Sequence, residues 1–141
     1  MSTTTNQAIT IKAIVNAPVE KVWNAWSNPE DIMKWNSASD DWHTPKAEND
    51  LRTGGKFLSR MEAKDGSWGF DFAGVYDNVE KFKVIEYTMG DGRRVEITFK
   101  PNGNNTHVVE SFDAEETNPV DMQRMGWQAI MDNFKKYVEA S

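Results

Sequence analysis

Apolar and polar residues alternate with a period of two in the opening and middle parts of the chain. Ile9, Ile11 and Val15 alternate with Thr10 and Lys12, which predicts a β-strand over residues 8–15. From residue 54 the same period returns, and a first strand is predicted over residues 56–63. Further strands follow as far as Asp113, separated by turn sequences at residues 64–66, 90–92 and 101–104. Successive strands joined by such short turns are expected to pair antiparallel.

Two short helices are predicted between the first strand and the rest of the sheet. Pro18 suits the first position of a helix, and apolar residues then recur at helical spacing as far as Trp26. Asn28 ends this helix and is expected to cap the next one, which reaches Trp35. Residues 36–51 show no periodicity and are rich in Ser, Asp and Asn. They are expected to form a long ordered loop that acts as a lid.

The last segment predicts a long amphipathic helix. Asn118 is expected to cap it and Pro119 to occupy its first position, with the helix running to about Glu139. At 100° per residue, a broad apolar face gathers Gly126, Trp127, Ile130, Phe134 and Tyr137. An apolar face this wide predicts that the sheet curls around the helix. The fold class is therefore α+β, a curved antiparallel sheet wrapped around a long C-terminal helix, with two short helices after the first strand.

Composition and charge narrow the function classes. The 141 residues fit a flexible tail over residues 1–7 and a single domain over residues 8–141. The chain has no cysteine, which excludes disulfides, thiolate catalysis and cysteine-bound metals. Its net charge of −6 argues against nucleic acid as a partner. The sequence contains no apolar run long enough to span a membrane and no signal peptide, so a cytoplasmic location is expected.

Several short motifs, in their order and spacing, resemble one known family. They are the run from Ala17 to Trp26, followed by Asn28-Pro29-Glu30 and Trp35; Gly54-Gly55-Lys56-Phe57; the run from Gly69 to Tyr76; Phe112-Asp113-x-Glu115; and Gly126-Trp127-Gln128-x-Ile130. This set is similar to the SRPBCC (START-like, helix-grip) superfamily, and within it to the branch named after the activator of the Hsp90 ATPase. The likeness covers roughly residues 8–139.

The resemblance implies a helix-grip fold with an internal cavity between the sheet and the terminal helix. Members of the superfamily bind lipids, sterols, aromatic polyketides and plant hormones, and some act as cyclases or aromatases. The implied partner is therefore a hydrophobic small molecule, with a chaperone as a possible second partner and no cofactor. The protein is expected to be a monomer or a weak homodimer.

Glu110 is the leading polar candidate. Period two places it on the more apolar face of the last strand, with Thr106, Val108 and Phe112. A carboxyl group there either reaches water at a mouth of the sheet or lies in the cavity and orients a polar ligand group. Gln123 falls amid the apolar face of the terminal helix. It either bonds the backbone at the helix entrance or joins Glu110 in the cavity.

The remaining cavity candidates are large apolar side chains, which either line the space or fill it. With Glu110 and Gln123, the predicted lining is Trp35, Trp42, Phe57, Met61, Trp68, Phe70, Phe72, Tyr76, Tyr87, Met89, Ile97, Phe112, Met122, Gly126, Trp127 and Ile130. Metal binding is not expected, because His43 and His107 are the only histidines and are far apart in sequence.

Three functions are compatible with these residues. The leading hypothesis is a binding module for an apolar or aromatic small molecule. The second is a cyclase- or isomerase-like enzyme that uses Glu110 or His43 for proton transfer. The third is a chaperone-interacting protein with an exposed apolar patch around Trp42.

Overall fold

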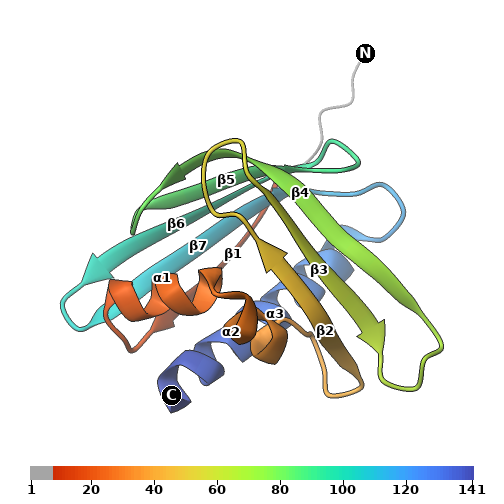
Figure 1. Ribbon diagram of the computed structural model, residues 1–141, viewed down its shortest axis with the longest axis horizontal. Coiled ribbons are helices and arrows are strands. Elements are labelled where there is room, and N and C mark those ends of the chain that lie inside the picture. The colour runs from red at the N-terminus through yellow and green to blue at the C-terminus, as the bar shows by residue number, and fades with distance from the viewer. Residues whose placement is uncertain (1–7) are drawn as a thin grey trace.

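The computed structural model describes residues 8–141, so the predicted tail over residues 1–7 lies outside the described residues. Figure 1 shows a curved sheet on one side and three helices on the other. In chain order the elements are β1 (Ala8–Val15), α1 (Val19–Ser27), α2 (Pro29–Trp35), β2 (Trp42–Asn49), β3 (Lys56–Ala63), β4 (Gly69–Glu80), β5 (Val84–Met89), β6 (Arg94–Asn102), β7 (Asn105–Asp113) and α3 (Val120–Ala140).

The sheet has the order β1-β7-β6-β5-β4-β3-β2, with every neighbouring pair antiparallel. Six of these strands follow one another as hairpins, and β1 closes the sheet by pairing with β7. The helices lie on the concave side of the sheet, as Figure 1 shows. The predicted helix-grip α+β fold is therefore confirmed.

The terminal helix α3 lies against the sheet through its apolar face. Met131, Phe134 and Val138 are buried, and the Phe134 side chain is completely enclosed (0% exposed). Its ring lies 4.9 Å from the rings of both Trp26 and Trp35, edge to face. Such edge-to-face contacts add to the free energy of burying apolar area, so this aromatic cluster holds α1, α2 and α3 together.

Two polar contacts fix the position of α3 along its length. The Gln128 Nε2 atom donates to the carbonyl oxygen of Lys12 on β1, at 3.0 Å. The Asn133 Nδ2 atom donates to the carbonyl oxygen of Trp35 at the end of α2, at 2.8 Å. Because each amide bonds a main-chain oxygen of a different element, α3 is attached at once to the sheet edge and to α2.

The predicted lid over residues 36–51 is wrong, because half of it forms the edge strand β2. Thr44 is buried, whereas Pro45 and Lys46 are exposed, and the pairing with β3 shifts between His43 and Lys46. A proline and a local bulge are tolerated at a sheet edge, where they interrupt the period-two pattern. The strand therefore carried no alternation that the sequence could reveal.

The helix starts differ slightly from prediction. The carbonyl groups of Pro18 and Pro119 accept the first helical bonds, so α1 and α3 begin one residue later, and neither proline provides a side-chain cap. The expected cap at Asn28 is confirmed, since its Oδ1 atom accepts from the Glu30 N–H at 3.0 Å. Asn118 does not cap α3, because the side chain of Gln123 occupies that entrance.

Gly74 on β4 sits where the main chain of β5 and an aromatic ring come very close. A Cβ atom at this position would lie 2.7 Å from the Thr88 carbonyl oxygen and 2.8 Å from Phe57 Cε1. These distances are too short for any side chain, so only glycine fits at this position. The glycine lets the Phe57 ring fold inward over β4.

Candidate functional site

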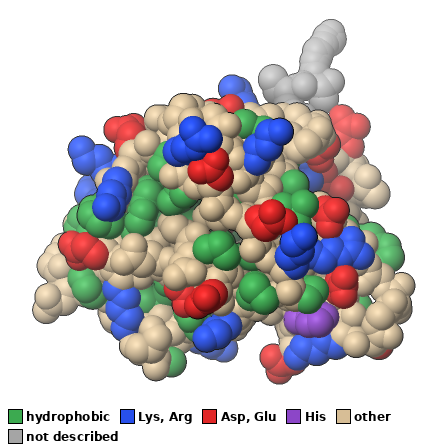
Figure 2. Space-filling view, in the orientation of Figure 1, with side chains coloured by type: hydrophobic (Ala, Val, Ile, Leu, Met, Phe, Trp, Pro, Cys, Tyr) green, Lys and Arg blue, Asp and Glu red, His purple; other side chains and the backbone are tan. Residues whose placement is uncertain are grey.

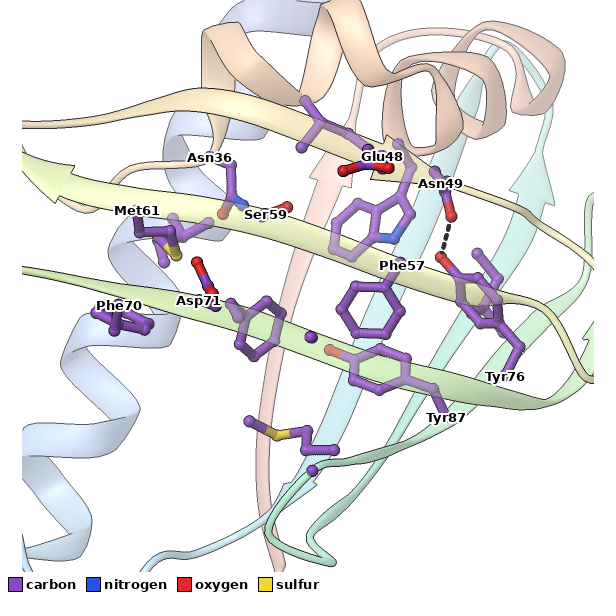
Figure 3. Close-up of a pocket in the computed structure, with 18 of the residues that line it drawn as sticks. Asn36, Glu48, Asn49, Phe57, Ser59, Met61, Phe70, Asp71, Tyr76 and Tyr87 are labelled. Carbon is purple, nitrogen blue, oxygen red and sulfur yellow. Dashed lines mark hydrogen bonds between the residues drawn. The ribbon is translucent and has the colours of Figure 1, made fainter.

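A cavity of about 510 Å³ lies between the concave face of the sheet and α3. Strands β3, β4 and β5 form one wall, α1, α2 and β2 form another, and α3 contributes Trp127 and Ile130. Figure 3 shows Phe57, Tyr76 and Tyr87 grouped in this space, with Met61 and Phe70 toward its other end. A cavity of this size suits a small organic molecule.

Aromatic rings support one another around the cavity. Phe57 meets Tyr87 edge to face at 4.7 Å, and Phe72 on β4 meets Trp127 on α3 at 6.1 Å. The Trp127 ring is stacked on Phe112 at 3.8 Å, which leaves Phe112 behind it and out of the cavity. The Phe72–Trp127 contact therefore joins sheet to helix across one side of the space.

A hydrogen-bonded chain closes the end of the cavity near β2. The Tyr76 hydroxyl donates to Asn49 Oδ1 at 2.5 Å, shown dashed in Figure 3, and Asn49 Nδ2 donates to the Ser27 carbonyl oxygen at 2.7 Å. Burial raises the pKa of the Tyr76 hydroxyl, so it stays protonated and acts as a donor. These bonds attach the edge strand β2 to α1 and β4.

Glu110 on β7 is a buried carboxyl group in the cavity lining. It is 5% exposed, and its neighbours across the sheet are Ile11 on β1 and Ile97 on β6. No hydrogen bond within residues 8–141 reaches its carboxyl oxygens, and burial alone raises the pKa of Glu110 to about 8. The predicted core-side orientation is confirmed, and at neutral pH the group holds its proton.

Two hydroxyl groups share the cavity with Glu110. Tyr87 and Ser59 are both buried and both line the space. Burial, with a further contribution from Glu110, raises the pKa of Tyr87 well above its usual value. Neither hydroxyl has a side-chain partner among the residues that the structure describes. The cavity thus offers three polar groups that remain available to a ligand.

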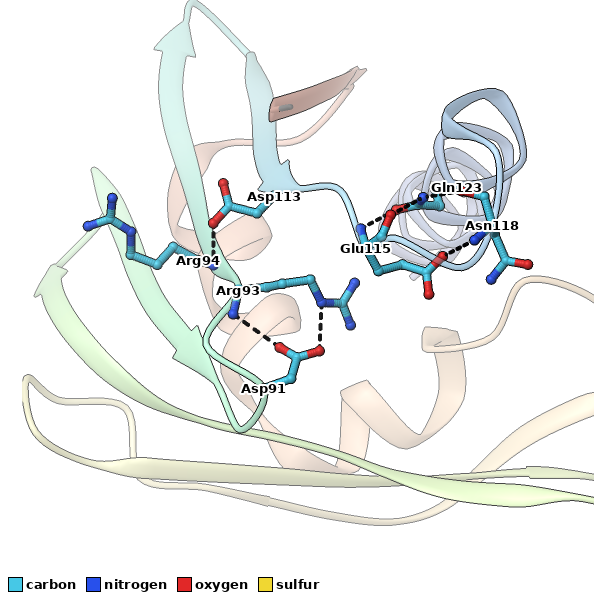
Figure 4. A network of polar contacts seen from close by, with 7 residues as sticks. All are labelled: Asp91, Arg93, Arg94, Asp113, Glu115, Asn118 and Gln123. Carbon is cyan, nitrogen blue, oxygen red and sulfur yellow. Dashed lines mark hydrogen bonds and ion pairs between the residues drawn. The ribbon is translucent and has the colours of Figure 1, made fainter. Parts of the chain in front are cut away.

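The turn between β5 and β6 brings one ion pair to the cavity. The Arg93 Nε atom lies 2.8 Å from Asp91 Oδ2, and the Arg93 backbone N–H bonds Asp91 Oδ1. Burial raises the pKa of Asp91, but these bonds outweigh it, and the net shift is downward. In Figure 4 the Arg93 side chain extends toward the loop that carries Glu115.

Gln123 lies at the entrance of α3, also shown in Figure 4. Its Nε2 atom donates to the carbonyl oxygens of Glu115 and Asn118, at 3.1 and 2.8 Å, and its Oε1 atom accepts from the Glu115 N–H at 2.9 Å. All three of these side-chain hydrogen bonds are made with main-chain atoms. Of the two alternatives, the structure therefore favours the structural one, and Gln123 does not line the cavity.

The structure brings many of the predicted residues together around one space. Those that line it are Trp35, Phe57, Met61, Phe70, Phe72, Tyr76, Tyr87, Met89, Glu110, Trp127 and Ile130. These residues share the concave face of a strand or the inner face of a helix. Because residues on one such face recur with a period of two in a strand or at helical spacing in a helix, the sequence pattern could predict them.

Other predicted residues lie elsewhere, each for a physical reason. Ile97 is completely enclosed in the hydrophobic core, and Met122 is 59% exposed on the first turn of α3. Gly126 has open space beside it instead of a cavity wall. Trp42 and Trp68 lie near the tip of the β3–β4 hairpin, where they pack on each other at 5.7 Å.

His43 and Glu110 are not brought together. His43 is on the opposite face of β2 from Trp42, and its Nε2 atom lies 3.9 Å from Glu62 Oε1, outside the cavity lining. In the described part of the chain, no three histidine or acidic side chains gather as a metal-ligand set. The two candidates for proton transfer therefore do not form one site.

Sequence reasoning missed part of the lining. The missed residues are Trp26, Ile32, Asn36, Glu48, Asn49, Ser59, Asp71, Ala73, Ile85, Gly90, Asp91 and Arg93. Ser59 was detectable, because it alternates with Phe57 and Met61 on one face of β3. Asn49 and Glu48 were not, since they belong to the strand that the pattern concealed.

The outer surface combines charge with one aromatic cluster. Figure 2 shows charged side chains of both signs over the viewed face, with hydrophobic side chains between them. Trp68 is 62% exposed and lies 5.4 Å from the ring of Phe70, which also contacts Trp42. We call these three residues the hairpin patch. No helix within residues 8–141 has the length and apolar character needed to cross a membrane.

Comparison with known proteins assigns the chain to a family. Residues 16–139 match the family model of the Activator of Hsp90 ATPase homolog 1-like proteins. The comparison with curated proteins gives no match.

Three solved structures illustrate the likeness. An AHSA1-like protein from Aeromonas hydrophila shares 46% identity and a TM-score of 0.89, over 95% of this chain and 93% of that one. Chr148 from Cytophaga hutchinsonii shares 55% identity with this chain and a TM-score of 0.82, over 94% of this chain and 92% of that one. CV1439 from Chromobacterium violaceum shares the fold at 23% identity and a TM-score of 0.85, over 94% of this chain and 98% of that one. The chain therefore belongs to the Activator of Hsp90 ATPase homolog 1-like family.

Proposed function

We propose that this chain is a binding module for an apolar, ring-containing small molecule held between the sheet and α3. The observation that carries the proposal is the cavity of about 510 Å³, which is walled by aromatic rings. It contains Glu110, Tyr87 and Ser59, which are buried and have no side-chain partners within residues 8–141. A well-packed core of this size leaves few voids, so an open space with a few polar groups is typical of a ligand site.

Family membership fits either hydrophobic-ligand binding or association with a chaperone. The hairpin patch favours a protein partner as the second candidate, because exposed aromatic groups mark interaction surfaces. An enzymatic role has less support, since among residues 8–141 Glu110 has no second acid–base group beside it except the Tyr87 hydroxyl, whose pKa is raised well above its usual value.

Native mass spectrometry of the freshly purified protein separates the two candidates. A retained small molecule adds a few hundred daltons, whereas a protein partner adds tens of kilodaltons. Only the first result supports the proposed function, and a partner that binds while the cavity stays empty supports the second candidate.

Filling the cavity is expected to abolish binding of an apolar probe. Ser59→Trp places a large ring in the space that Ser59 now borders, so the affinity for the neutral dye N-phenyl-1-naphthylamine should fall at least tenfold. Ser59→Leu should give a smaller loss in the same direction. Dye fluorescence measures the dissociation constant, and circular dichroism confirms that each variant is folded.

The matched control is Thr98→Trp. Thr98 lies on β6 between the buried Ile97 and Phe99, so its side chain points to the outer face of the sheet. Dye affinity should stay within about twofold of the unmodified protein. Equal loss in the Ser59 and Thr98 variants would show that the dye does not bind in the cavity.

A further inference from the structure

Glu110 is the one acidic group of the cavity lining, within residues 8–141, that has no basic group beside it. Glu48 is 3.2 Å from Lys46, Asp71 is 3.3 Å from Arg60, and Asp91 is 2.8 Å from Arg93. These pairs come from β2, from β3 with β4, and from the β5–β6 turn. Each is already compensated before any ligand enters.

The surroundings of Glu110 within the sheet are apolar. Ile11 and Ile97 lie opposite it on the two neighbouring strands, and Val108 and Phe112 flank it on β7. Among residues 8–141 no charged group adds to the effect of burial on the pKa of Glu110. The Tyr87 hydroxyl on β5, which lines the same space, is neutral. A buried carboxyl group in such surroundings is costly unless a partner arrives.

The cavity walls favour a positive charge. The faces of aromatic rings carry negative electrostatic potential, and Phe57, Tyr87 and Trp127 all border the space that Glu110 borders. A desolvated cation is attracted to such ring faces, and a carboxylate beside it adds a charge-assisted hydrogen bond that strengthens its binding. An anion would meet ring faces and an acidic group, with Arg93 already bound to Asp91.

We infer that the ligand of this cavity is a ring-bearing organic amine whose ammonium group binds the Glu110 carboxylate, while its ring lies among Phe57, Tyr87 and Trp127. The inference rests on the proposed function and names the chemical class of the ligand. Tyr87 and Ser59 supply hydroxyl oxygens that accept the remaining ammonium hydrogens.

Binding of this kind releases a proton. Before binding at pH 7, the Glu110 carboxyl group holds its proton, because its pKa is raised to about 8. The amine enters as an ammonium ion, and the ion pair requires an ionised carboxylate. Close to one proton therefore leaves the carboxyl group for the solvent with each ligand bound.

Three probes with the same ring test the inference: 1-naphthylmethylamine, 1-naphthylmethanol and 1-naphthoic acid. Isothermal titration calorimetry at pH 7 should show the amine binding at least tenfold more tightly than the alcohol, with the acid weakest. Titrations of the amine in phosphate and in Tris, whose ionisation enthalpies differ, should give about one proton released. The proton count needs no variant.

Glu110→Gln should reduce the preference for the amine over the alcohol to about onefold, while alcohol binding stays within about threefold. Glu96→Gln removes a carboxyl group from an exposed position on β6 and should leave the preference unchanged, which excludes a general effect of losing one acidic residue. An amine preference that survives Glu110→Gln would overturn the inference.

The outcomes separate the two proposals. If the alcohol binds as tightly as the amine and no proton is released, Glu110 acts as a neutral hydrogen-bonding group, so the inference fails and the proposed function stands. If none of the probes binds and the native mass spectrum shows no small molecule, both fail.

Discussion

Replacing Phe134 by alanine is expected to remove about 3–5 kcal/mol from the free energy of unfolding. The ring is completely enclosed and makes edge-to-face contacts with Trp26 and Trp35 at 4.9 Å each. The rigid indole rings cannot collapse into the space, so the variant loses transfer free energy and retains a cavity. Urea denaturation followed by circular dichroism measures the difference.

Met125→Ala is the matched control on the same helix. Met125 is 72% exposed, so its truncation should change the free energy of unfolding by no more than about 0.5 kcal/mol. If Phe134→Ala were as mild as this control, α3 would not be seated in the concave face of the sheet, and the cavity would lose one of its walls.

Glu110 is expected to make the protein less stable as the pH rises. In the unfolded chain a glutamate titrates near 4.5, whereas in the folded protein the pKa of Glu110 is about 8. Between these values the folded state keeps a proton that the unfolded state has lost. The contribution is therefore full below pH 4.5 and falls as the pH approaches 8, by at most about 5 kcal/mol.

Glu110→Gln isolates this contribution, since glutamine has the same shape and does not titrate. At pH 5 the two proteins should unfold with free energies within about 1 kcal/mol of each other. At pH 9 the variant should be the more stable by several kcal/mol. Urea titrations at both pH values measure the difference, and parallel pH profiles would mean that Glu110 is not buried in an apolar environment.

Much of the fold was predictable because its elements carry strong periodicity. The β3 bounds are reproduced to the residue, and α3 differs from its prediction by one residue at each end. Edge strand β2 was not predictable, since Pro45 and a bulge interrupt its alternation. Elements with a regular apolar period, such as β3 and α3, can be found from sequence. An edge strand such as β2 lacks that period, and its strand conformation depends on pairing with β3 in the folded sheet.

The site was predictable in part. Glu110 could be found because it breaks an apolar face of β7, and Trp127 because it lies on the apolar face of α3. Arg93 and Asn49 reach the cavity only through the curvature of the sheet, which brings a turn and an edge strand around one space. Trp68 was expected in the cavity but lies outside its lining, 62% exposed near the tip of the β3–β4 hairpin.

The most direct test of the central claim is the location of a bound apolar molecule. Amide chemical shifts of the ¹⁵N-labelled protein, followed by NMR as N-phenyl-1-naphthylamine is added, map that location residue by residue. The largest shifts are predicted at Ser59, Tyr87, Glu110 and Trp127. Shifts concentrated at Trp68 or on the outer face around Thr98, with Glu110 unchanged, would contradict binding between the sheet and α3.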